Sequence, residues 1–196
     1  MKKIAAIFDM DGTLIDNNPF HFRSWQILFK RHGLPELSQE SYNQKMSGVP
    51  GMQSLRNLFG EEYDEAELHK WFEEKTAIYK EEYEAYIKPI NGLERFLSEL
   101  KEAGIHMAVA TSASLQNVDF IFGHLSIRDF FDTIIDSTRL SEPKPNPQIF
   151  LKAAKDLGIP PQRCVVFEDS MSGVKAANSA GMKVVAITTT LSLIHI

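Results

Sequence analysis

The segment IFDMDGTLID (Ile7–Asp16) places two acidic residues, Asp9 and Asp11, directly after an apolar run that begins at Ile4. Continuous rather than alternating hydrophobicity over Ile4–Phe8 predicts a strand of a parallel sheet that is covered on both faces. Two lysines precede the run, as in a signal peptide, but the run is short and ends at Asp9, so we interpret it as a strand. Because Asp9 and Asp11 carry like charges, their close spacing requires a chemical explanation.

Other apolar runs along the chain have the same character. They predict further strands at His106–Ala110, Cys164–Phe167 and Lys183–Ile187, with a weaker candidate at Thr133–Asp136. Helical patterns that end at a glycine lie between the runs, at Gly92–Gly104, Asn146–Gly158 and Ser170–Gly181. In the first of these helices we expect Phe96 on the buried face. Strands that alternate with helices predict the α/β class, with a doubly wound, Rossmann-like parallel sheet.

Residues 17–86 interrupt this alternation with helices alone. The patterns predict these helices at His21–Gly33, Ser38–Met46, Gly51–Phe59 and Asp64–Tyr86. We therefore expect a Rossmann-like catalytic core, residues 1–16 and 87–190, and an inserted helical cap domain, residues 17–86. Hinges near residues 17–18 and 87–89 would let the cap open for a substrate and then close to exclude water.

The last residues of the chain differ in character from the rest. A sheet of this kind normally continues after the strand at Lys183–Ile187, whereas here the sequence runs TTTLSLIHI and stops. Leu191–Ile196 matches one reading frame of a transposon-end sequencing adapter. We therefore expect the C-terminus to be truncated, and residues 191–196 to be a non-native tail. Resequencing of the native locus checks this expectation, and a stop codon directly after Ile196 in intact genomic DNA would contradict it.

The composition is that of an ordinary globular protein, with 43% hydrophobic and 24% charged residues and a net charge of -5. The negative charge argues against a nucleic acid or an anionic membrane as partner. No apolar run approaches the ~20 residues that a membrane helix needs. The single cysteine, Cys164, excludes an internal disulfide and suits a reducing compartment, so we expect a cytoplasmic protein. We also expect a monomer.

Polar residues follow the predicted strands at the points where the strands end. These segments are Asp9–Thr13, Thr111–Ser114, Pro143–Pro145 and Glu168–Ser170. Ligands of open α/β sheets bind outside the carboxyl ends of the strands, so we expect the four segments to meet at one edge. Lysine and hydroxyl groups there can hold a phosphate, which the carboxylates would repel unless a cation is also present.

A divalent cation would explain the pair of aspartates, Asp9 and Asp11. Mg²⁺ fits best, because it prefers oxygen ligands and keeps several waters. It would offset the repulsion among Asp9, Asp169 and an incoming phosphate. Asp9 can then attack phosphorus, as carboxylate nucleophiles do in aspartyl-phosphate enzymes. Asp11 can act as general acid to the leaving oxygen and then as base for water.

Three other residues complete the predicted chemistry. We expect Lys144 and Ser112 to stabilise the phosphoryl oxygens in the transition state, and Gly12 to let the backbone turn sharply beside them. Each feature also has an ordinary explanation: a solvated turn, a lysine between two prolines, or acidic residues at the start of a helix. Their occurrence at successive strand ends is a much less probable coincidence.

The haloacid dehalogenase superfamily has four ordered motifs, and nearly the whole chain resembles it, with matches at Asp9–Thr13, Ser112, Lys144-Pro145 and Glu168-Asp169. The resemblance implies that Asp9 is the nucleophile and a metal ligand, and that Asp11 is the acid/base whose backbone carbonyl also binds Mg²⁺. It further implies that Asp169 completes the metal ligands, with Glu168 as a further ligand or its support. Dehalogenases proper lack the second aspartate, so Asp11 favours phosphoryl transfer.

Within this superfamily the cap resembles the β-phosphoglucomutase-like subfamily, at HFRSW (His21–Trp25), SGV (Ser47–Val49) and Lys75. The resemblance implies that His21 helps to position the acid/base aspartate. It also implies a set of substrate contacts from both domains, at Gly12, His21, Gly48, Val49, Lys75, Ser112, Ala113 and Lys144. By contrast, we expect Tyr79 to belong to a helix face rather than to contact substrate.

One position departs from the mutase pattern. Where the mutase has an arginine that grips the second phosphate of its substrate, our alignment places Gly51. The absence of this arginine favours a phosphatase over a mutase, although a basic residue elsewhere in the cap, such as Arg56, could substitute for it.

Three functions remain open at this point. The leading hypothesis is a Mg²⁺-dependent hydrolase of small phosphomonoesters, with sugar phosphates favoured, that works through an aspartyl-phosphate. The alternative is a β-phosphoglucomutase that interconverts glucose 1-phosphate and glucose 6-phosphate. A second alternative is a catalytically idle binding module on the same fold, against which the intact Asp9 and Asp11 argue.

Overall fold

A computed structural model describes residues 3–46, 49–60 and 62–190 of the chain. The chain divides into two compact units, Met1–Asp16 with Ile87–Ile196, and Asn17–Tyr86. We call them the core unit and the cap unit. The expected non-native tail, residues 191–196, lies outside the described residues.

The core unit contains a five-stranded parallel sheet with the strand order β3-β2-β1-β4-β5. The strands are β1 (Ala5–Phe8), β2 (His106–Ala110), β3 (Thr133–Ile135), β4 (Cys164–Glu168) and β5 (Lys183–Ala186). The predicted fold class is confirmed, and the weaker strand candidate forms the edge strand β3. Phe8 of the central strand pairs with Val109 on one side and Phe167 on the other, so the carboxyl ends of β1, β2 and β4 are level.

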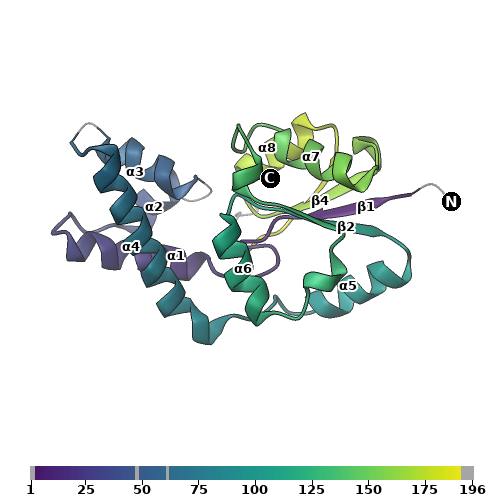
Figure 1. The fold of residues 1–196 in the computed structure, drawn as a ribbon, viewed down its shortest axis with the longest axis horizontal. Coiled ribbons are helices and arrows are strands. Elements are labelled where there is room, and N and C mark those ends of the chain that lie inside the picture. The colour runs from purple at the N-terminus through teal and green to yellow at the C-terminus, as the bar shows by residue number, and fades with distance from the viewer. Residues whose placement is uncertain (1–2, 47–48, 61, 191–196) are drawn as a thin grey trace. The chain divides into compact units, whose positions relative to one another are not determined.

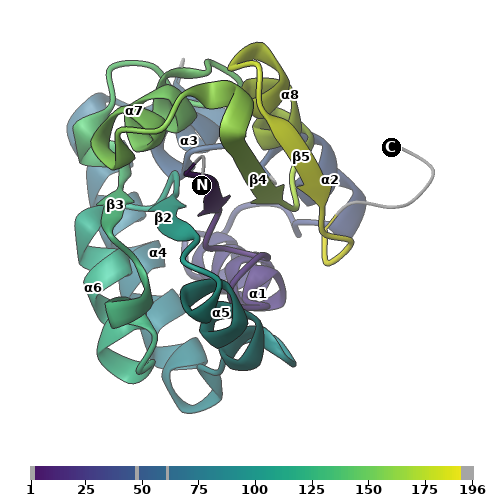
Figure 2. The same ribbon diagram turned by 90° about the vertical axis from the view of Figure 1, so that its right-hand side faces the viewer.

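Helices cover both faces of this sheet, with α7 and α8 on one face and α5 on the other (Figure 1, Figure 2). The core-unit helices are α5 (Leu93–Glu102), α6 (Leu115–His124), α7 (Gln148–Leu157) and α8 (Met171–Ser179). Ile7 is buried in the cluster that includes residues of α7 and α8. Phe8, one position further on, packs against Phe96, Phe131 and Phe167. Burial on both faces thus explains why the apolar run of β1 is unbroken.

Two details of the core unit differ from expectation. α6 has no counterpart among the predicted helices, because the isoleucine and phenylalanines in LQNVDFIFGH favour strands as readily as helices. The prediction that Phe96 is buried is wrong, since it is 37% exposed while Leu93 and Leu97 are buried. The buried face of α5 is narrower than the stripe of apolar residues in its sequence. Phe96 lies at the edge of that face and makes ring-edge contacts with Phe8 and Phe167.

Four α-helices make up most of the described part of the cap unit. They are α1 (Asn18–Arg31), α2 (Gln39–Lys45), α3 (Gly51–Phe59) and α4 (Glu65–Tyr83). Ser38 and Asp64 cap α2 and α4, because their side chains accept hydrogen bonds from Ser41 N (3.1 Å) and Glu67 N (2.8 Å). The buried core of the unit includes Trp25, Leu28, Tyr42, Leu55, Leu68 and Trp71.

Short 3₁₀ helices complete the described elements, at Glu84–Tyr86, Arg128–Phe130, Ser137–Arg139 and Pro161–Arg163. Within the three described ranges, no helix combines the length and the hydrophobicity that crossing a membrane would require.

Candidate active site

A buried ion-pair cluster lies at the carboxyl edge of the sheet. Lys144 Nζ donates hydrogen bonds to Asp9 Oδ1 (2.6 Å) and Glu168 Oε2 (2.8 Å), and a longer one to the carbonyl oxygen of Ala110 (3.3 Å). Asp9, Lys144 and Glu168 are all buried. The Lys144 ammonium group therefore links the loop before α7 to the ends of β1, β2 and β4.

The turn after β1 holds Asp9 in place. Its backbone N–H donates to the carbonyl of Phe167 (2.9 Å), which extends the pairing of β1 with β4 by one residue. Gly12 then has a φ of 75°, in the left-handed region where glycine is favoured, and donates its N–H to the Ile15 carbonyl (2.7 Å). Asp11 lies half-buried within this turn. The sharp turn keeps both aspartates close to the end of β1.

Lys144 reaches the cluster with an apolar stem and a charged tip. Its ammonium lies 5.1 Å from the centre of the Phe150 ring, a cation–π contact with the first turn of α7. The expected strand-end position of Lys144 is thus reached from a loop that α7 supports.

Asp169 follows Glu168 and is also buried. Two threonines after β5 contact this part of the site: Thr190 Oγ1 donates a hydrogen bond to Asp169 Oδ2, and Thr189 Oγ1 donates to the Gly12 carbonyl. No sequence pattern marks these threonines, because they stand in a run of three and only the folded sheet brings them to Asp169 and Gly12.

Carboxylates outnumber ammonium groups in this cluster. Burial raises the pKa of Asp9 well above its ordinary value, while Lys144 acts in the opposite direction. The carboxylates of Glu168, Asp169 and Asp11 add to the rise. Burial alone would lower the pKa of Lys144, but Asp9 and Glu168 outweigh it and raise that pKa. Lys144 is therefore charged at neutral pH, and the excess of carboxylates favours a further cation.

Three carboxylates are arranged so that they can share a metal ion. One oxygen from each of Asp9, Glu168 and Asp169 lies within 4.8 Å of the other two. Hard oxygen ligands with an excess of negative charge fit Mg²⁺. The side chain of Asp11 is not part of this set; the resemblance implies that Asp11 contributes its backbone carbonyl.

Ser112 and Ala113 form the turn after β2, where both are half-buried. Ala113 donates its N–H to Thr111 Oγ1 (3.0 Å) and accepts from Ser137 N (2.9 Å), which fixes the turn. In the described part of the chain, no hydrogen bond joins the Ser112 side chain to Asp9 or Lys144. Ser112 is thus at the predicted edge of the sheet without direct contact to the ion-pair cluster.

The cap unit holds a buried polar cluster around His21. His21 Nδ1 lies 2.8 Å from Lys75 Nζ, and the imidazole stacks on Tyr79 with ring centres 4.1 Å apart. The Lys75 ammonium lies 5.3 Å and 5.1 Å from the ring centres of Trp25 and Tyr79. Asn17 Nδ2 lies 2.7 Å from the Tyr79 hydroxyl and 3.3 Å from His21 Nε2. Because an ammonium can only donate, Nδ1 of His21 is the acceptor.

Two residues named by the sequence analysis are therefore joined. His21 and Lys75, 54 positions apart in the chain, form a direct contact. Tyr79 lies on the buried face of α4, where it contacts both of them. Val49 is half-buried and donates its N–H to the Met46 carbonyl (3.1 Å). Gly48 lies outside the described residues.

Position 51 and Arg56 are the two places where a cationic side chain could contact a second phosphate of the substrate. In the structure both positions are occupied by contacts within the cap unit. A Cβ atom at Gly51 would lie 2.4 Å from Phe72 Cε2, so the Phe72 ring fills the space of a side chain at this position. Arg56 pairs with Glu65 through two hydrogen bonds, from Nε (2.6 Å) and from Nη2 (2.9 Å). A side chain at position 51 therefore requires Phe72 to move, and Arg56 is already engaged.

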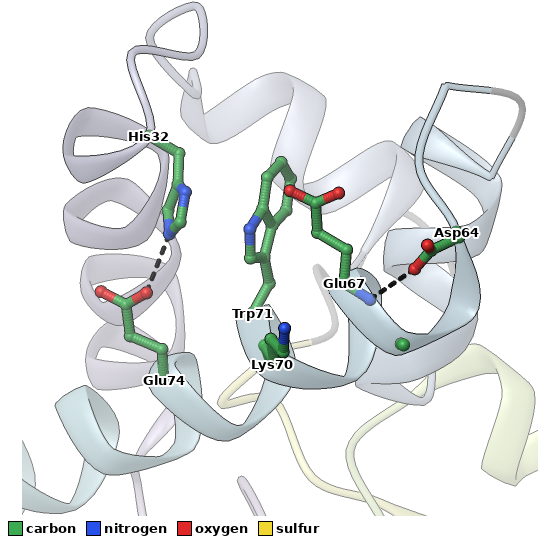
Figure 3. A pocket seen from close by; sticks show the side chains of 7 residues that line it. His32, Asp64, Glu67, Lys70, Trp71 and Glu74 are labelled. Carbon is green, nitrogen blue, oxygen red and sulfur yellow. Dashed lines mark hydrogen bonds and ion pairs between the residues drawn. The ribbon is translucent and has the colours of Figure 1, made fainter.

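The cap unit also has a pocket of about 460 Å³ on α4, and Figure 3 shows its lining residues. At one side of it His32 Nε2 and Glu74 Oε2 are 2.8 Å apart, and at the other Asp64 accepts a hydrogen bond from Glu67 N. These polar groups stabilise the ends of α1 and α4. None of the predicted site residues lines this pocket, which is formed by His32, Asp64, Ala66, Glu67, Lys70, Trp71 and Glu74.

Comparison with known proteins gives a consistent result. A family model described as haloacid dehalogenase-like hydrolase matches residues 6–187. The phosphorylated carbohydrates phosphatase of Thermotoga maritima is 33% identical over 183 residues, which cover 91% of this chain and 82% of that protein. The β-phosphoglucomutase of Bacillus subtilis is 31% identical over 194 residues, which cover 93% and 82%. The crystal structure of CbbY from Rhodobacter sphaeroides in complex with xylulose-1,5-bisphosphate has a TM-score of 0.81 and 30% identity, over 93% of this chain and 85% of that one.

Proposed function

This chain belongs to the haloacid dehalogenase-like hydrolase family, and we propose that it is a Mg²⁺-dependent phosphohydrolase of small phosphomonoesters, sugar phosphates in particular. The observation that carries the proposal is the buried cluster in which Lys144 contacts Asp9 and Glu168 at the carboxyl edge of the sheet. Such a cluster combines a carboxylate nucleophile, an ammonium for phosphoryl oxygens and oxygen ligands for a cation. Family membership and the intact cluster make an idle binding module untenable.

The proposed reaction has two steps. Asp9, Glu168 and Asp169, with the backbone carbonyl of Asp11, would hold Mg²⁺, which would supply positive charge that offsets the repulsion between carboxylates and phosphoryl oxygens. Asp9 attacks phosphorus, so that an Asp9–phosphorus bond forms while the bond to the leaving oxygen breaks, and Asp11 donates a proton to that oxygen. A water then attacks phosphorus and gives its proton to Asp11. The acyl phosphate breaks, which releases phosphate and restores the Asp9 carboxylate.

Other residues of the core unit bind and orient the phosphoryl group. Lys144 is within hydrogen-bonding distance of the nucleophile, and its three donors are engaged by Asp9, Glu168 and the Ala110 carbonyl. A phosphoryl oxygen would replace the longest of these bonds, the one to the Ala110 carbonyl (3.3 Å). The Ser112 hydroxyl would provide a further donor from the turn after β2, where Ala113 is a neighbour of the phosphoryl group and its N–H is held by Thr111 Oγ1. Gly12 allows the close turn of the backbone that keeps Asp11 beside Asp9.

Substrate specificity is proposed to lie in the cap unit. His21, Lys75 and the loop at Gly48 and Val49 would contact the part of the substrate that is not transferred. The cluster that holds Lys75 between His21 and two aromatic rings supports this role, because a buried ammonium with few rotamers is a well-oriented donor. We further propose that the enzyme is a cytoplasmic monomer, for which the lone and buried Cys164 is suited.

The similarity to a phosphatase of phosphorylated carbohydrates supports sugar phosphates as substrates. The similarity to a β-phosphoglucomutase keeps the mutase as a second candidate. We favour hydrolysis, because the Phe72 ring fills the side-chain space at Gly51 and Arg56 is paired with Glu65. In a mutase, a bisphosphate intermediate must turn around in the site while a cationic side chain holds its second phosphate. Neither position 51 nor Arg56 offers such a cation here.

The two candidates predict different products. Full-length protein should release phosphate from one or more sugar phosphates in a panel that also contains phosphoglycolate, nucleotides and pyrophosphate. The measurement compares free phosphate with isomer formation from β-glucose 1-phosphate. Efficient conversion to glucose 6-phosphate with little free phosphate would overturn our preference for the hydrolase.

Removal of divalent cations should abolish phosphate release. The physical reason is that phosphate must approach a cluster in which burial and three carboxylates already raise the pKa of Asp9. The measurement is the rate after chelation and after readdition of Mg²⁺, with thermal unfolding of the same samples as a control for folding. Activity that survives complete chelation would contradict the proposed role of Mg²⁺.

Substitution of Lys75 by methionine should lower kcat/KM by roughly 10- to 100-fold, because a hydrogen-bonding charge is lost while the buried stem is kept. Steady-state phosphate release with the best sugar phosphate measures the effect. Lys70→Met, an exposed change on the same helix, is the matched control. Equal kinetics in the two variants would remove Lys75 from the substrate contacts.

A further inference from the structure

The Glu168 carboxylate is held from two directions. Its Oε1 accepts hydrogen bonds from Ser170 N (3.0 Å) and Ser170 Oγ (2.7 Å), at the beginning of α8. Its Oε2 accepts from Lys144 Nζ (2.8 Å). Glu168 therefore connects the first turn of α8 to the ammonium group that contacts Asp9.

Gly173 provides the space in which this carboxylate lies. A Cβ atom at position 173 would be 2.0 Å from Cδ, 2.1 Å from Oε2 and 2.4 Å from Oε1 of Glu168, all far shorter than any real Cβ contact. The backbone of Gly173 does not itself require glycine, because it lies within α8 and is not among the residues with positive φ. Glycine is unfavourable inside a helix relative to alanine, so its presence here calls for a separate reason.

We propose that Gly173 is a positioning residue for the phosphoryl-transfer site. Its missing side chain lets the Glu168 carboxylate lie against α8, and Glu168 in turn directs Lys144 towards Asp9. Gly173 touches no reacting atom and acts through these two side chains. This inference rests on the proposed function, in which Lys144 binds the phosphoryl oxygens.

A side chain at position 173 should therefore impair catalysis through Lys144. With Glu168 displaced, Lys144 keeps Asp9 as its counter-charge and loses its second anchor, so the ammonium shifts relative to the phosphoryl group. Displacements of about 1 Å at such a position lower rates by roughly 100-fold. Because Lys144 binds phosphate in the ground state too, the affinity for inorganic phosphate should fall along with kcat.

The chain offers a matched control for the substitution Gly173→Ala. Gly123 also lies within a helix, has no positive φ, and a Cβ atom there would have nothing within 4 Å. We expect Gly123→Ala to leave kcat and phosphate inhibition unchanged and to raise the unfolding temperature slightly, because alanine is the better helix former. Gly173→Ala should lower the unfolding temperature by on the order of 5 °C or more and weaken inhibition by inorganic phosphate. Identical behaviour of the two variants would overturn the inference.

A second pair of variants separates crowding of the carboxylate from a general need for glycine. Glu168→Asp withdraws the carboxylate by one methylene, which leaves room for a Cβ atom at position 173. The expected result is non-additive: adding Gly173→Ala to Glu168→Asp should lower neither the unfolding temperature nor the phosphate affinity further. If Gly173→Ala lowers the unfolding temperature and the phosphate affinity equally in wild type and in Glu168→Asp, the positioning role is refuted. A wild type that releases no phosphate from any substrate would refute the proposed function instead, and the unfolding temperatures would still show whether Gly173 makes room for the Glu168 carboxylate.

Discussion

Substitution of Asp9 by asparagine should abolish phosphate release, with a loss of roughly 10⁴-fold or more, as expected when a nucleophile is removed. The amide of asparagine has nearly the same shape as the carboxylate, but it cannot attack phosphorus to form an acyl phosphate. The fold should tolerate the change, because burial raises the pKa of Asp9 and so disfavours its charged form. Asparagine also retains an oxygen that can accept the hydrogen bond from Lys144.

The measurement combines turnover with detection of the intermediate. Wild-type protein, quenched with acid during turnover of a labelled substrate, should retain label on the protein, whereas Asp9→Asn should retain none. Asp11→Asn should slow turnover strongly without a comparable loss of metal binding, because Asp11 moves protons rather than forming the bond. Asp129→Asn, an exposed substitution, serves as the control with full activity. Full activity of Asp9→Asn would rule out the covalent route.

The sheet and its catalytic edge are predictable from the sequence because both depend on local patterns. Strands of a parallel sheet buried on both faces have continuous apolar runs, and the expected run at Cys164–Phe167 differs from β4 by one residue. The order of the polar segments along the chain then places Asp9, Lys144 and Glu168 at one edge, where the structure joins them by hydrogen bonds. To predict this meeting point, it is enough to know that ligands of open α/β sheets bind outside the carboxyl ends of the strands.

What could not be predicted depends on contacts between distant segments. Tyr79 resembles any other aromatic residue of a helix face until its stacking on His21 is seen. Thr190 stands in a run of threonines, and only the folded sheet brings it to Asp169. Gly173 is one glycine among 11, and the reason for its missing side chain is a carboxylate five residues earlier in the chain. Such residues have no periodic signal in the sequence, so their roles emerge only from the folded structure.

Substitution of Lys144 by methionine should reduce both catalysis and stability. Phosphate release should fall by on the order of 10²–10³-fold, as when a preorganised donor to the transition state is removed. The free energy of unfolding should fall by roughly 3–5 kcal/mol at pH 8 in the absence of divalent cations, because Asp9 and Glu168 are left as buried carboxylates without their ammonium partner. Lys175→Met, an exposed change on α8, should alter stability by no more than about 0.5 kcal/mol.

The stability loss of Lys144→Met should depend on pH in a defined direction. The pKa of Lys144 is raised in the folded state, so its contribution is fully present at neutral pH and is lost only as the pH rises through that elevated value. Without Lys144, the pKa of Asp9 loses the one influence that lowers it. The folded variant then binds protons that the unfolded chain does not, so acidification favours its folded state. Unfolding in chelator-containing buffers should therefore show the difference from wild type shrinking from pH 8 to pH 5. A difference that stays constant over this range would mean that Lys144 stabilises the fold by packing rather than by neutralising the carboxylates.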